Sequence, residues 1–439
     1  MIPSPFHSLN ELLLDGKDAR LHLDERGRNH YFCMPQVQEN LHLWGSSTAS
    51  NISPKQWQHA QTLWQQMRDD VQTYGIEISR TRDTSQVQHE LQQCLQLPET
   101  SSVILAESGT DAHRQWMQHL IQQHPQDSWC IIMPEALETG RSIPEALTPK
   151  ASHICIRSFA LRDPQGQPRT RDAIKMEVTQ HLKHAIHAKQ RILLIMVDAS
   201  KTGCLAPHPD DIDIWNNAYH ERLHVLVDAC QGRLGMGAIH AYLQQGACVA
   251  ITGSKFWGAP SFCAALLVPK QHQPPQATTA SFGMLLRWQL ALHTMRQCHA
   301  LGKEACQHAM QRISHSIQQH MRASPHLQPL STDGIARPQE QTIDWNQYPS
   351  IFPFFIRHKH GLMSHRQALQ LYQALQSDTH MPIQMGRPIP IPKQKDDAGL
   401  FRLCISAPLM IQEAQHATVS CQQVPQIIQH IERCSHTPA

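Results

Sequence analysis

A lysine that follows a buried strand is the residue in this chain best suited to covalent chemistry. Lys255 comes directly after the apolar run CVAITGS (248–254), and small residues surround it in ITGSKFWGAP. Burial of the amine lowers the pKa of a lysine and favours its neutral, nucleophilic form. Small neighbours also let a planar ligand approach the backbone. An ordinary surface lysine in a turn does not need these features, so the pattern predicts an amine that forms a Schiff base with a carbonyl group.

An acidic residue closes the preceding buried strand. Asp228 ends HVLVDA (224–229), and one helical segment separates it from the strand before Lys255. Open α/β sheets bind ligands outside the carboxyl ends of their strands, so both side chains are expected at one edge of the sheet. A carboxylate there can keep a heterocyclic ring nitrogen protonated. The alternative is a cap for the turn that follows.

Small hydroxylated residues join an upstream strand to an amphipathic helix. Ser108, Gly109 and Thr110 lie between SSVILAE (101–107) and AHRQWMQHLIQQH. The N–H groups at a helix N-terminus, together with two hydroxyls, form an anion site suited to phosphate. The alternative is a serine cap with an acidic first turn at Asp111.

Together these segments resemble the cofactor-binding core of fold-type I pyridoxal-phosphate (PLP) enzymes, nearest to the class V aminotransferase and cysteine desulfurase branch. ITGSKFWGAP is similar to the (S/T)-G-x-K-x-x-G-P pattern of that branch, and Ser108–Thr110 to its phosphate loop. The resemblance implies that PLP is the cofactor, that Lys255 forms the internal aldimine and then acts as general base, and that Asp228 contacts the pyridine nitrogen. The cofactor-binding set it implies is Ser108, Gly109, Thr110, Ser200, Asp228, Gln231, Thr252, Ser254 and Lys255.

Four members of this set rest on the resemblance alone, and two of them, Thr252 and Ser254, match positions that contact the phosphate in the family. Gln231 completes D-A-x-Q and is expected at the cofactor's 3-hydroxyl. Ser200 occupies the matching place in DASKTG (198–203), where class V relatives carry N-E-(T/I)-G, and Lys201 replaces the acid of that motif. The residue that stacks on the cofactor ring stays open, because MPEALETGRS (133–142) has no aromatic residue or histidine; Glu138 and Thr139 are expected near the ring.

Two arginines are candidates for binding a substrate carboxylate. Fold-type I aminotransferases commonly use an arginine of the small domain for this purpose, and a guanidinium fork matches a carboxylate. Arg402, in LFRLCISAP, is the first choice and Arg387, in MGRPIPI, is the second. For each, the alternative is an ordinary surface charge.

The pattern of apolar segments indicates how these residues are positioned. Strand-length apolar runs alternate with helical segments from about residue 56, which is typical of a mostly parallel sheet covered on both faces. The connection from Lys255 to SFCAALLVP is too short for a crossover helix, so that strand is expected to be antiparallel. We expect a large α/β domain at 56–290 and a smaller α+β domain with its linking helices at 291–439. Residues 1–55 are interpreted as an irregular arm whose GSSTAS segment is a solvated loop; the alternative is a segment that folds over an active site.

The resemblance extends these expectations to the whole architecture. It implies the fold-type I PLP-dependent transferase fold, with a mostly parallel seven-stranded sheet between helices and a smaller C-terminal domain. It also implies a homodimer, because active sites of this superfamily form at a subunit interface.

Composition excludes several other classes. A formal charge of +2 with interspersed signs gives no indication of a nucleic-acid partner, and no apolar run is long enough for a membrane span. The 13 cysteines are unpatterned and no signal peptide is recognised, which favours a reducing, cytoplasmic location. The 31 histidines show no metal-ligand spacing and are interpreted as surface residues, so no metal is expected.

The most favoured reaction is transamination of an amino acid or amine. A PLP-dependent lyase that cleaves a C–S or C–C bond, including a decarboxylase, is the alternative, and a non-catalytic protein of the same fold is a further one. Desulfurase activity ranks low because 324–350 contains no cysteine to act as the mobile nucleophile. GRLGMG (232–237) lacks the spacing of a dinucleotide-binding glycine loop.

Overall fold

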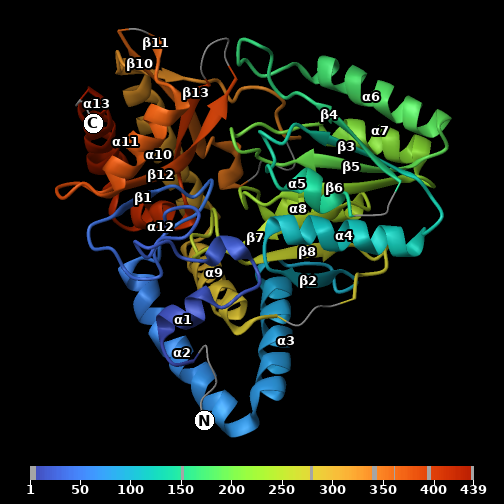
Figure 1. Cartoon of the computed structure of the whole chain (residues 1–439), viewed down its shortest axis with the longest axis horizontal. Helices are drawn as coiled ribbons and strands as arrows, with labels where there is room; N and C mark the ends of the chain where they lie inside the picture. Colours follow the sequence, from blue (N-terminus) through green and yellow to red (C-terminus); the bar gives the residue numbers. More distant parts are fainter. Residues whose placement is uncertain are drawn as a thin grey trace.

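A seven-stranded sheet forms the centre of the larger domain in the computed structural model, which describes residues 6–149, 153–276, 280–338, 344–359, 361–392 and 397–436 (Figure 1). The strand order is β2-β8-β7-β6-β5-β3-β4. The strands are β2 (Ser102–Ala106), β3 (Trp129–Pro134), β4 (Ile154–Phe159), β5 (Arg191–Val197), β6 (Leu223–Ala229), β7 (Cys248–Thr252) and β8 (Ala264–Val268). Strands β3 to β7 pair in parallel, whereas β8 is antiparallel to both β2 and β7, as its short connection predicts.

Helices cover both faces of this sheet, which explains why its strands are continuous apolar runs. On β5, Leu193 and Ile195 pack against the helices of one face, while Ile192 and Leu194 pack with those of the other. The first face carries α4 (Gly109–Gln123) and α5 (Ile143–Leu147); the second carries α6 (Arg171–His187), α7 (Pro209–Tyr219) and α8 (Met236–Gln244). With no face left for water, neither side of a strand needs polar residues.

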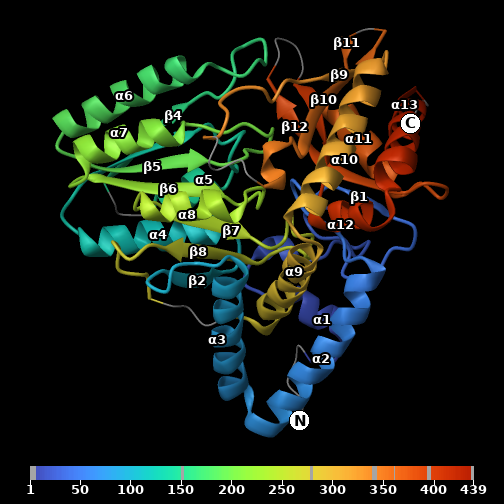
Figure 2. The same ribbon diagram turned by 180° about the vertical axis from the view of Figure 1, so that it is seen from behind.

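A helical hairpin projects from the junction of the domains. Helices α2 (Pro54–Tyr74) and α3 (Ile76–Cys94) meet at Gly75 at the tip of a V that both views show (Figures 1 and 2). Gly75 has a φ of 83°, a conformation that glycine adopts without strain. Helix α2 begins with a capping box between Ser53 and Gln56.

Two long helices connect the domains. Helix α9 (Phe282–Leu301) packs against α1 (Leu9–Leu14), α2, α3 and α12, so it is apolar on almost every side. Helix α10 (Lys303–Ala323) then enters the smaller domain, where it packs on α12 and α13. None of the helices in the described part of the chain has the length and apolar character that a membrane crossing requires.

The smaller domain is built on a second, mostly antiparallel sheet. Its strands are β9 (Leu327–Pro329), β10 (Ile351–His358), β11 (Gly361–Leu362), β12 (Ile383–Ile391) and β13 (Ala398–Cys404), and its helices are α11 (His365–Gln376), α12 (Ala407–His416) and α13 (Val424–His436). Strand β1 (His42–Trp44), from the N-terminal arm, completes the sheet by pairing in parallel with β12. The arm is therefore part of the folded small domain rather than a separate irregular segment.

Strand β12 was not expected from the sequence, because Gly386, Pro388 and Pro390 interrupt its pattern. The structure accommodates them through a register shift between Gly386 and Ile389 in the pairing with β13. The other edge of β12 pairs with β1 only at Ile383–Met385, so the prolines interrupt no ladder there.

Candidate active site

A cavity of about 460 Å³ lies at the carboxyl ends of the central strands, between the large domain, the N-terminal arm and the small domain. Most of the predicted site residues line it: Ser108, Gly109, Thr110, Asp228, Thr252, Ser254, Lys255, Arg387 and Arg402. They come from five separate segments of the chain, which the fold brings to one place. Ser200 and Gln231 are not among the lining residues.

Lys255 is partly buried in the turn that follows β7. Burial is the main cause that lowers the pKa of its amine, and the nearby guanidinium groups of Arg233 and Arg402 lower it further. The Cys230 thiol and the Asp228 carboxylate oppose this shift. The surroundings of Lys255 thus favour a neutral amine, the form that attacks a carbonyl carbon.

The glycine at position 253 serves packing. A Cβ on Gly253 would lie 2.6 Å from the Cβ of Ala291 on α9 and 2.9 Å from the Sγ of Cys263. The small residue therefore lets α9 pack closely against the turn that holds Lys255. Packing is thus one reason for a small residue at position 253, beside the predicted approach of a planar ligand.

Asp228 has a partner that sequence analysis missed. The Nε2 atom of His113, on α4, lies 3.7 Å from Oδ2 of Asp228, and the histidine is fully buried. Asp228 Oδ1 accepts a hydrogen bond from the backbone N–H of Cys230 at 3.1 Å. His113 lies on the same buried stripe of α4 as Trp116 and Leu120. The helical spacing of these residues in the sequence was the signal that could have identified His113 as buried.

The N-terminus of α4 carries a cap and lies against the cavity. The Ser108 hydroxyl accepts a hydrogen bond from the N–H of Asp111 at 3.3 Å, so the capping interpretation is correct. The cavity still lies against Ser108, Gly109 and Thr110, whose helix N-terminus carries partial positive charge. The cap is confirmed, and the anion site stays a prediction that the cap does not exclude.

Arg20, from the N-terminal arm, adds a full positive charge at this helix end. Its Nη2 donates to the Ser108 hydroxyl at 3.2 Å, and its guanidinium also pairs with Asp18. It lies over the ring of Phe262, 4.6 Å from the ring centroid. No local pattern in the sequence identifies Arg20, because only the fold of the arm brings it to the α4 N-terminus.

The arm closes one side of the cavity. Ser47 and Thr48 line the cavity, and Ser46 and Ser47 are buried. The Ser46 hydroxyl accepts a hydrogen bond from Arg233 at 2.7 Å. The interpretation of GSSTAS as a solvated loop is wrong, and the alternative, a segment folded over the site, matches the structure.

Gln231 holds this arm instead of lining the cavity. Its Nε2 donates to the backbone carbonyl of Ser47 at 3.1 Å, while its Oε1 is buried without a hydrogen-bond partner in the described part of the chain. Its expected contact with a cofactor hydroxyl stays a prediction, for which the unpartnered Oε1 is the available acceptor. Its contribution is to position Ser47 and Thr48.

The Ser200 hydroxyl is bound to a neighbouring carboxylate. It donates to Oε2 of Glu138 at 2.7 Å, and Thr202 binds the same carboxylate at 2.8 Å. Both Ser200 and Glu138 are buried in this network and neither lines the cavity. The expected contact of Ser200 with a cofactor and the placement of Glu138 near its ring stay predictions; Thr139 does line the cavity.

Lys201, the residue after Ser200, does line the cavity. Burial, assisted by the positive charges of Arg402 and Lys255, lowers the pKa of Lys201 to about 7. The lining includes six lysine and arginine side chains and a single carboxylate, Asp228. This excess of positive charge fits an occupant that carries more than one anionic group.

The two candidate arginines differ in how far they are already engaged. Arg402 is only 1% exposed, and its Nε and Nη1 have no hydrogen-bond partner within the described residues. Its Nη2 donates to Thr48 and to the carbonyl of Arg387. The Arg387 guanidinium instead donates to the carbonyl of His30 at 2.9 Å and helps to hold the arm. Arg402 therefore has free donors for a carboxylate, whereas Arg387 is partly used.

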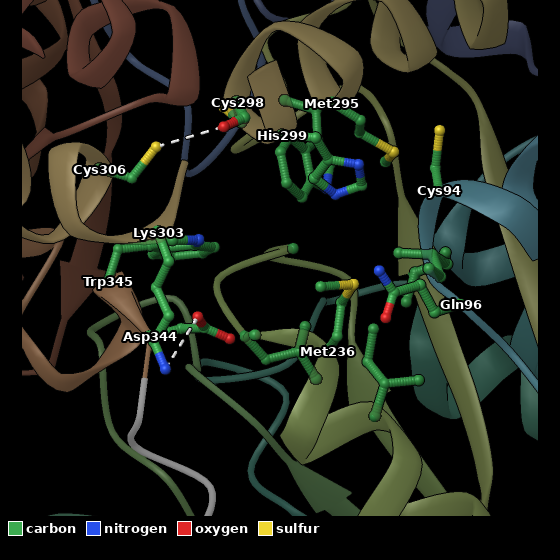
Figure 3. A pocket seen from close by; sticks show the side chains of 17 residues that line it. Cys94, Gln96, Met236, Met295, Cys298, His299, Lys303, Cys306, Asp344 and Trp345 are labelled. Carbon is green, nitrogen blue, oxygen red and sulfur yellow. Dashed lines mark hydrogen bonds and ion pairs between the residues drawn. The ribbon is translucent and has the colours of Figure 1, made fainter. Parts of the chain in front are cut away.

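A second cavity, of about 230 Å³, lies on the other side of the β6 and β7 ends, where α9 and α10 meet (Figure 3). Sulfur-containing and aromatic side chains dominate its labelled wall, including Met236, Met295, Cys306 and Trp345. Its charged pair, Lys303 and Asp344, is 4.0 Å apart. None of the predicted site residues lines it, so the larger cavity is the candidate active site.

No family model matches the chain, and no curated protein matches it in sequence. Solved structures do match. A NifS-like protein superposes with a TM-score of 0.58 at 11% identity, over 89% of this chain and 100% of that one. The TDC of Oryza sativa, solved with PLP, superposes with a TM-score of 0.57 at 11% identity, over 90% of this chain and 82% of that one. The chain has the fold of fold-type I PLP-dependent enzymes, which confirms the predicted fold class.

Proposed function

We propose that the larger cavity binds PLP and that the protein is a PLP-dependent enzyme acting on an amino acid. The observation that carries this proposal is the convergence of Lys255, Asp228 and the α4 N-terminus on one cavity. These are the amine, the acid and the anion site that PLP requires.

The residues present fit the cofactor. Lys255 provides the amine for covalent attachment, and Asp228 is the acid for the pyridine nitrogen. The α4 N-terminus and Arg20 provide donors for a phosphate, to which the hydroxyl of Ser254 adds a further one from the cavity wall. When bound, PLP withdraws electrons from the α-carbon of an amine substrate.

The protein's own part in the reaction is to orient the substrate and to move a proton. Lys255, whose pKa is lowered by burial and which lies within electrostatic range of Asp228, is the base that takes a proton from the substrate α-carbon. Asp228 keeps a proton at the ring nitrogen, and the backbone N–H of Cys230 holds Oδ1 of its carboxylate in place. The arm, held by Gln231, covers the cavity and restricts water.

The substrate class follows from the positive charges. Arg402 has unused donors in a fully buried position, and this arrangement supports recognition of a carboxylate by a bidentate pair. Lys201 and Arg387 add charge nearby. An amino acid that keeps its carboxylate on binding fits this wall better than a simple amine does.

Transamination is the first candidate reaction, and a lyase reaction is the second. The lyase candidate is favoured by the likeness to the TDC of Oryza sativa and to a NifS-like protein. A desulfurase mechanism is less well supported, because Cys230 is the one cysteine that lines the cavity within the described residues. Burial, together with the Asp228 charge, raises the pKa of the Cys230 thiol well above its ordinary value, so it is a poor nucleophile.

The first experiment tests whether the protein binds PLP and which lysine carries it. Purified protein incubated with PLP is reduced with borohydride and digested, and the modified peptide is identified by mass spectrometry. Modification of Lys255 but not of Lys201, the second lysine of the same cavity, is expected. A protein that acquires no visible absorption band and no modified lysine contradicts PLP binding.

The reaction is then identified from its products. A panel of amino acids is incubated with the PLP-loaded protein, and oxo acids, amines and sulfide are measured separately. Oxo acid formation that depends on an added amino acceptor is expected for transamination, whereas an amine or sulfide identifies the lyase alternative. Homodimerisation and a cytoplasmic location remain part of this proposal; sedimentation of the purified protein tests the first.

A further inference from the structure

A cluster of metal-ligating side chains lies far from the larger cavity, where the C-terminal helix packs on the small domain. His430 and Cys434 are one helical turn apart on α13, so they share a face of that helix. Asp378 lies in the connection between α11 and β12. Helices α11 and α13 lie side by side in both views (Figures 1 and 2). The three ligand atoms lie within 4.8 Å of one another.

The geometry matches the requirements of a tetrahedral metal ion. His430 Nε2 lies 3.5 Å from Oδ2 of Asp378 and 3.5 Å from Sγ of Cys434. Zinc bonds of about 2.0–2.3 Å at tetrahedral angles place ligand atoms roughly 3.3–3.6 Å apart. The two separations from His430 Nε2 are therefore those of ligands around one ion, and the third, between Asp378 and Cys434, is within 4.8 Å.

Backbone hydrogen bonds fix the carboxylate of the cluster, and two of its three residues are accessible to solvent. Oδ1 of Asp378 accepts hydrogen bonds from the backbone N–H groups of His380 and Met381, both at 2.8 Å, which fixes the carboxylate and leaves Oδ2 directed at His430. The His430 side chain is buried, whereas Asp378 and Cys434 are partly exposed, so an ion can enter from solvent. Two further imidazoles, of His42 and His380, lie within electrostatic range of His430.

We propose that Asp378, His430 and Cys434 form a zinc site that fastens the C-terminal helix to the small domain. A thiolate, an imidazole and a carboxylate are the donors that Zn²⁺ prefers, and the fourth position is left to water or to a neighbouring imidazole. On binding, the Cys434 thiol releases its proton to solvent. The proton of the His430 ring then resides on Nδ1, and Arg433, which contacts Nδ1 at 3.2 Å, turns away into solvent.

The location gives the site a structural purpose. Asp378 leads into β12, the strand that carries Arg387 and pairs with the strand carrying Arg402. An ion that ties α13 to this connection stabilises the sheet that forms one wall of the larger cavity. The site is independent of PLP, so its test does not depend on the proposed enzyme function.

The experiment is a zinc titration of the full chain, without an affinity tag, in competition with a chromophoric chelator. One tight equivalent of Zn²⁺ and the release of a proton are expected. Co²⁺ alone is the spectroscopic probe, and it should give the visible bands of a tetrahedral ion together with a thiolate-to-cobalt band. Zn²⁺ should also raise Tm.

Matched variants decide the assignment. Cys434→Ser and His430→Gln should lose the tight equivalent, the thiolate band and the Tm increase, and Asp378→Asn, at a partly exposed position, should weaken binding without risk to the core. Cys421→Ser and His416→Gln replace an exposed thiol and an exposed imidazole outside the cluster, and should bind zinc like the parent. If the parent binds no tight equivalent, or if the cluster variants retain it, the three residues are only a hydrogen-bonded group and the proposal is wrong.

Discussion

The imidazole of His113 is buried behind Asp228, which lines the larger cavity, with His113 Nε2 3.7 Å from Asp228 Oδ2. The other ring nitrogen, Nδ1, lies 2.7 Å from the carbonyl oxygen of Gly109. A carbonyl only accepts, so Nδ1 carries a proton and the ring orientation is fixed. His113 therefore links the helix end at the anion site to the acid expected at the pyridine nitrogen.

Replacing His113 tests this link. In His113→Ala the Gly109 carbonyl loses a buried hydrogen bond and the Asp228 carboxylate loses a buried neighbour, so PLP affinity should fall about 5–150-fold, which corresponds to roughly one to three kcal/mol. The absorption maximum of the bound cofactor should shift, a change that a general loss of stability does not produce. His119→Ala, on the same helix but outside the cavity, is the control. Parent-like affinity and spectrum in His113→Ala would show that the pair has no such role.

The two lysines of the cavity should behave differently. Lys255→Ala is expected to lower turnover by about 10²–10⁴-fold, because the base at the substrate α-carbon is lost, and to prevent covalent retention of PLP after borohydride reduction. Lys201→Ala should retain covalent PLP. Turnover is measured with saturating PLP, and the retained cofactor by mass. The assignment of Lys255 is rejected if the two variants exchange these phenotypes.

The lowered pKa of Lys201 predicts a pH dependence of substrate binding. With a pKa near 7, Lys201 is charged below that pH and loses its positive charge above it. KM for a carboxylated substrate should therefore rise as the pH increases through about 7 and beyond, with a midpoint moved upward by the bound anion. In Lys201→Met the same region of the KM profile should be flat. A parent profile identical to that of Lys201→Met would remove Lys201 from substrate binding.

The lowered pKa of Lys201 also predicts that the free energy of unfolding increases with pH, whereas substrate binding weakens as the pH rises. The ordinary lysine pKa of the unfolded chain is about 10.4, so between pH 7 and 10 the unfolded state binds more protons at Lys201 than the folded state does. Stability from this group then increases with pH across that window and is lowest below pH 7. Urea denaturation of the parent and of Lys201→Met should therefore show a stability difference that shifts in favour of the parent as the pH rises.

Most of the larger domain and the centre of the site follow from local sequence patterns. Lys255 and Asp228 end strands buried on both faces, and such strands are recognised as continuous apolar runs. Strand β12 is not recognised from the sequence, because prolines are rare inside strands. They are tolerated here because β1 pairs with β12 only at Ile383–Met385 and leaves the rest of that edge unpaired by β1. A local sequence pattern does not show how long the partner strand is.

The site contacts that the sequence did not predict have a common physical cause. Ser200 and Gln231 were placed by the family pattern alone, and in this fold their polar groups bind Glu138 and the Ser47 carbonyl. Arg20 reaches the anion site only because the arm folds across the cavity. Each of these contacts joins segments far apart in the sequence, so the residues that compete for a side chain are unknown until the tertiary structure is available.

Close packing behind Lys255 predicts a stability effect at Gly253. Gly253→Ala places a methyl group 2.6 Å from the Cβ of Ala291, and such overpacking should cost about 1–3 kcal/mol of unfolding free energy. Denaturant unfolding measures the loss. Ala291→Gly removes the opposing methyl group, so the double variant should show a favourable coupling energy. Strict additivity of the two changes would mean that the contact does not limit the packing.

Arg402 is the residue whose substitution separates substrate binding from the other steps. Its Nε and Nη1 are buried donors without partners in the described part of the chain, so a substrate carboxylate is expected to satisfy them. Arg402→Lys keeps the charge but loses the fork, and should raise KM for an amino acid about 10–100-fold with a smaller change in kcat, as expected when charge-assisted hydrogen bonds worth one and a half to three kcal/mol are lost. Arg387→Lys should have a smaller effect, because the Arg387 guanidinium is already bound to His30. Steady-state kinetics with an amino acid and with the corresponding amine, which lacks the carboxylate, measure the difference. If Arg402→Lys raises KM equally for both, the arginine supports the wall of the cavity and does not bind the carboxylate.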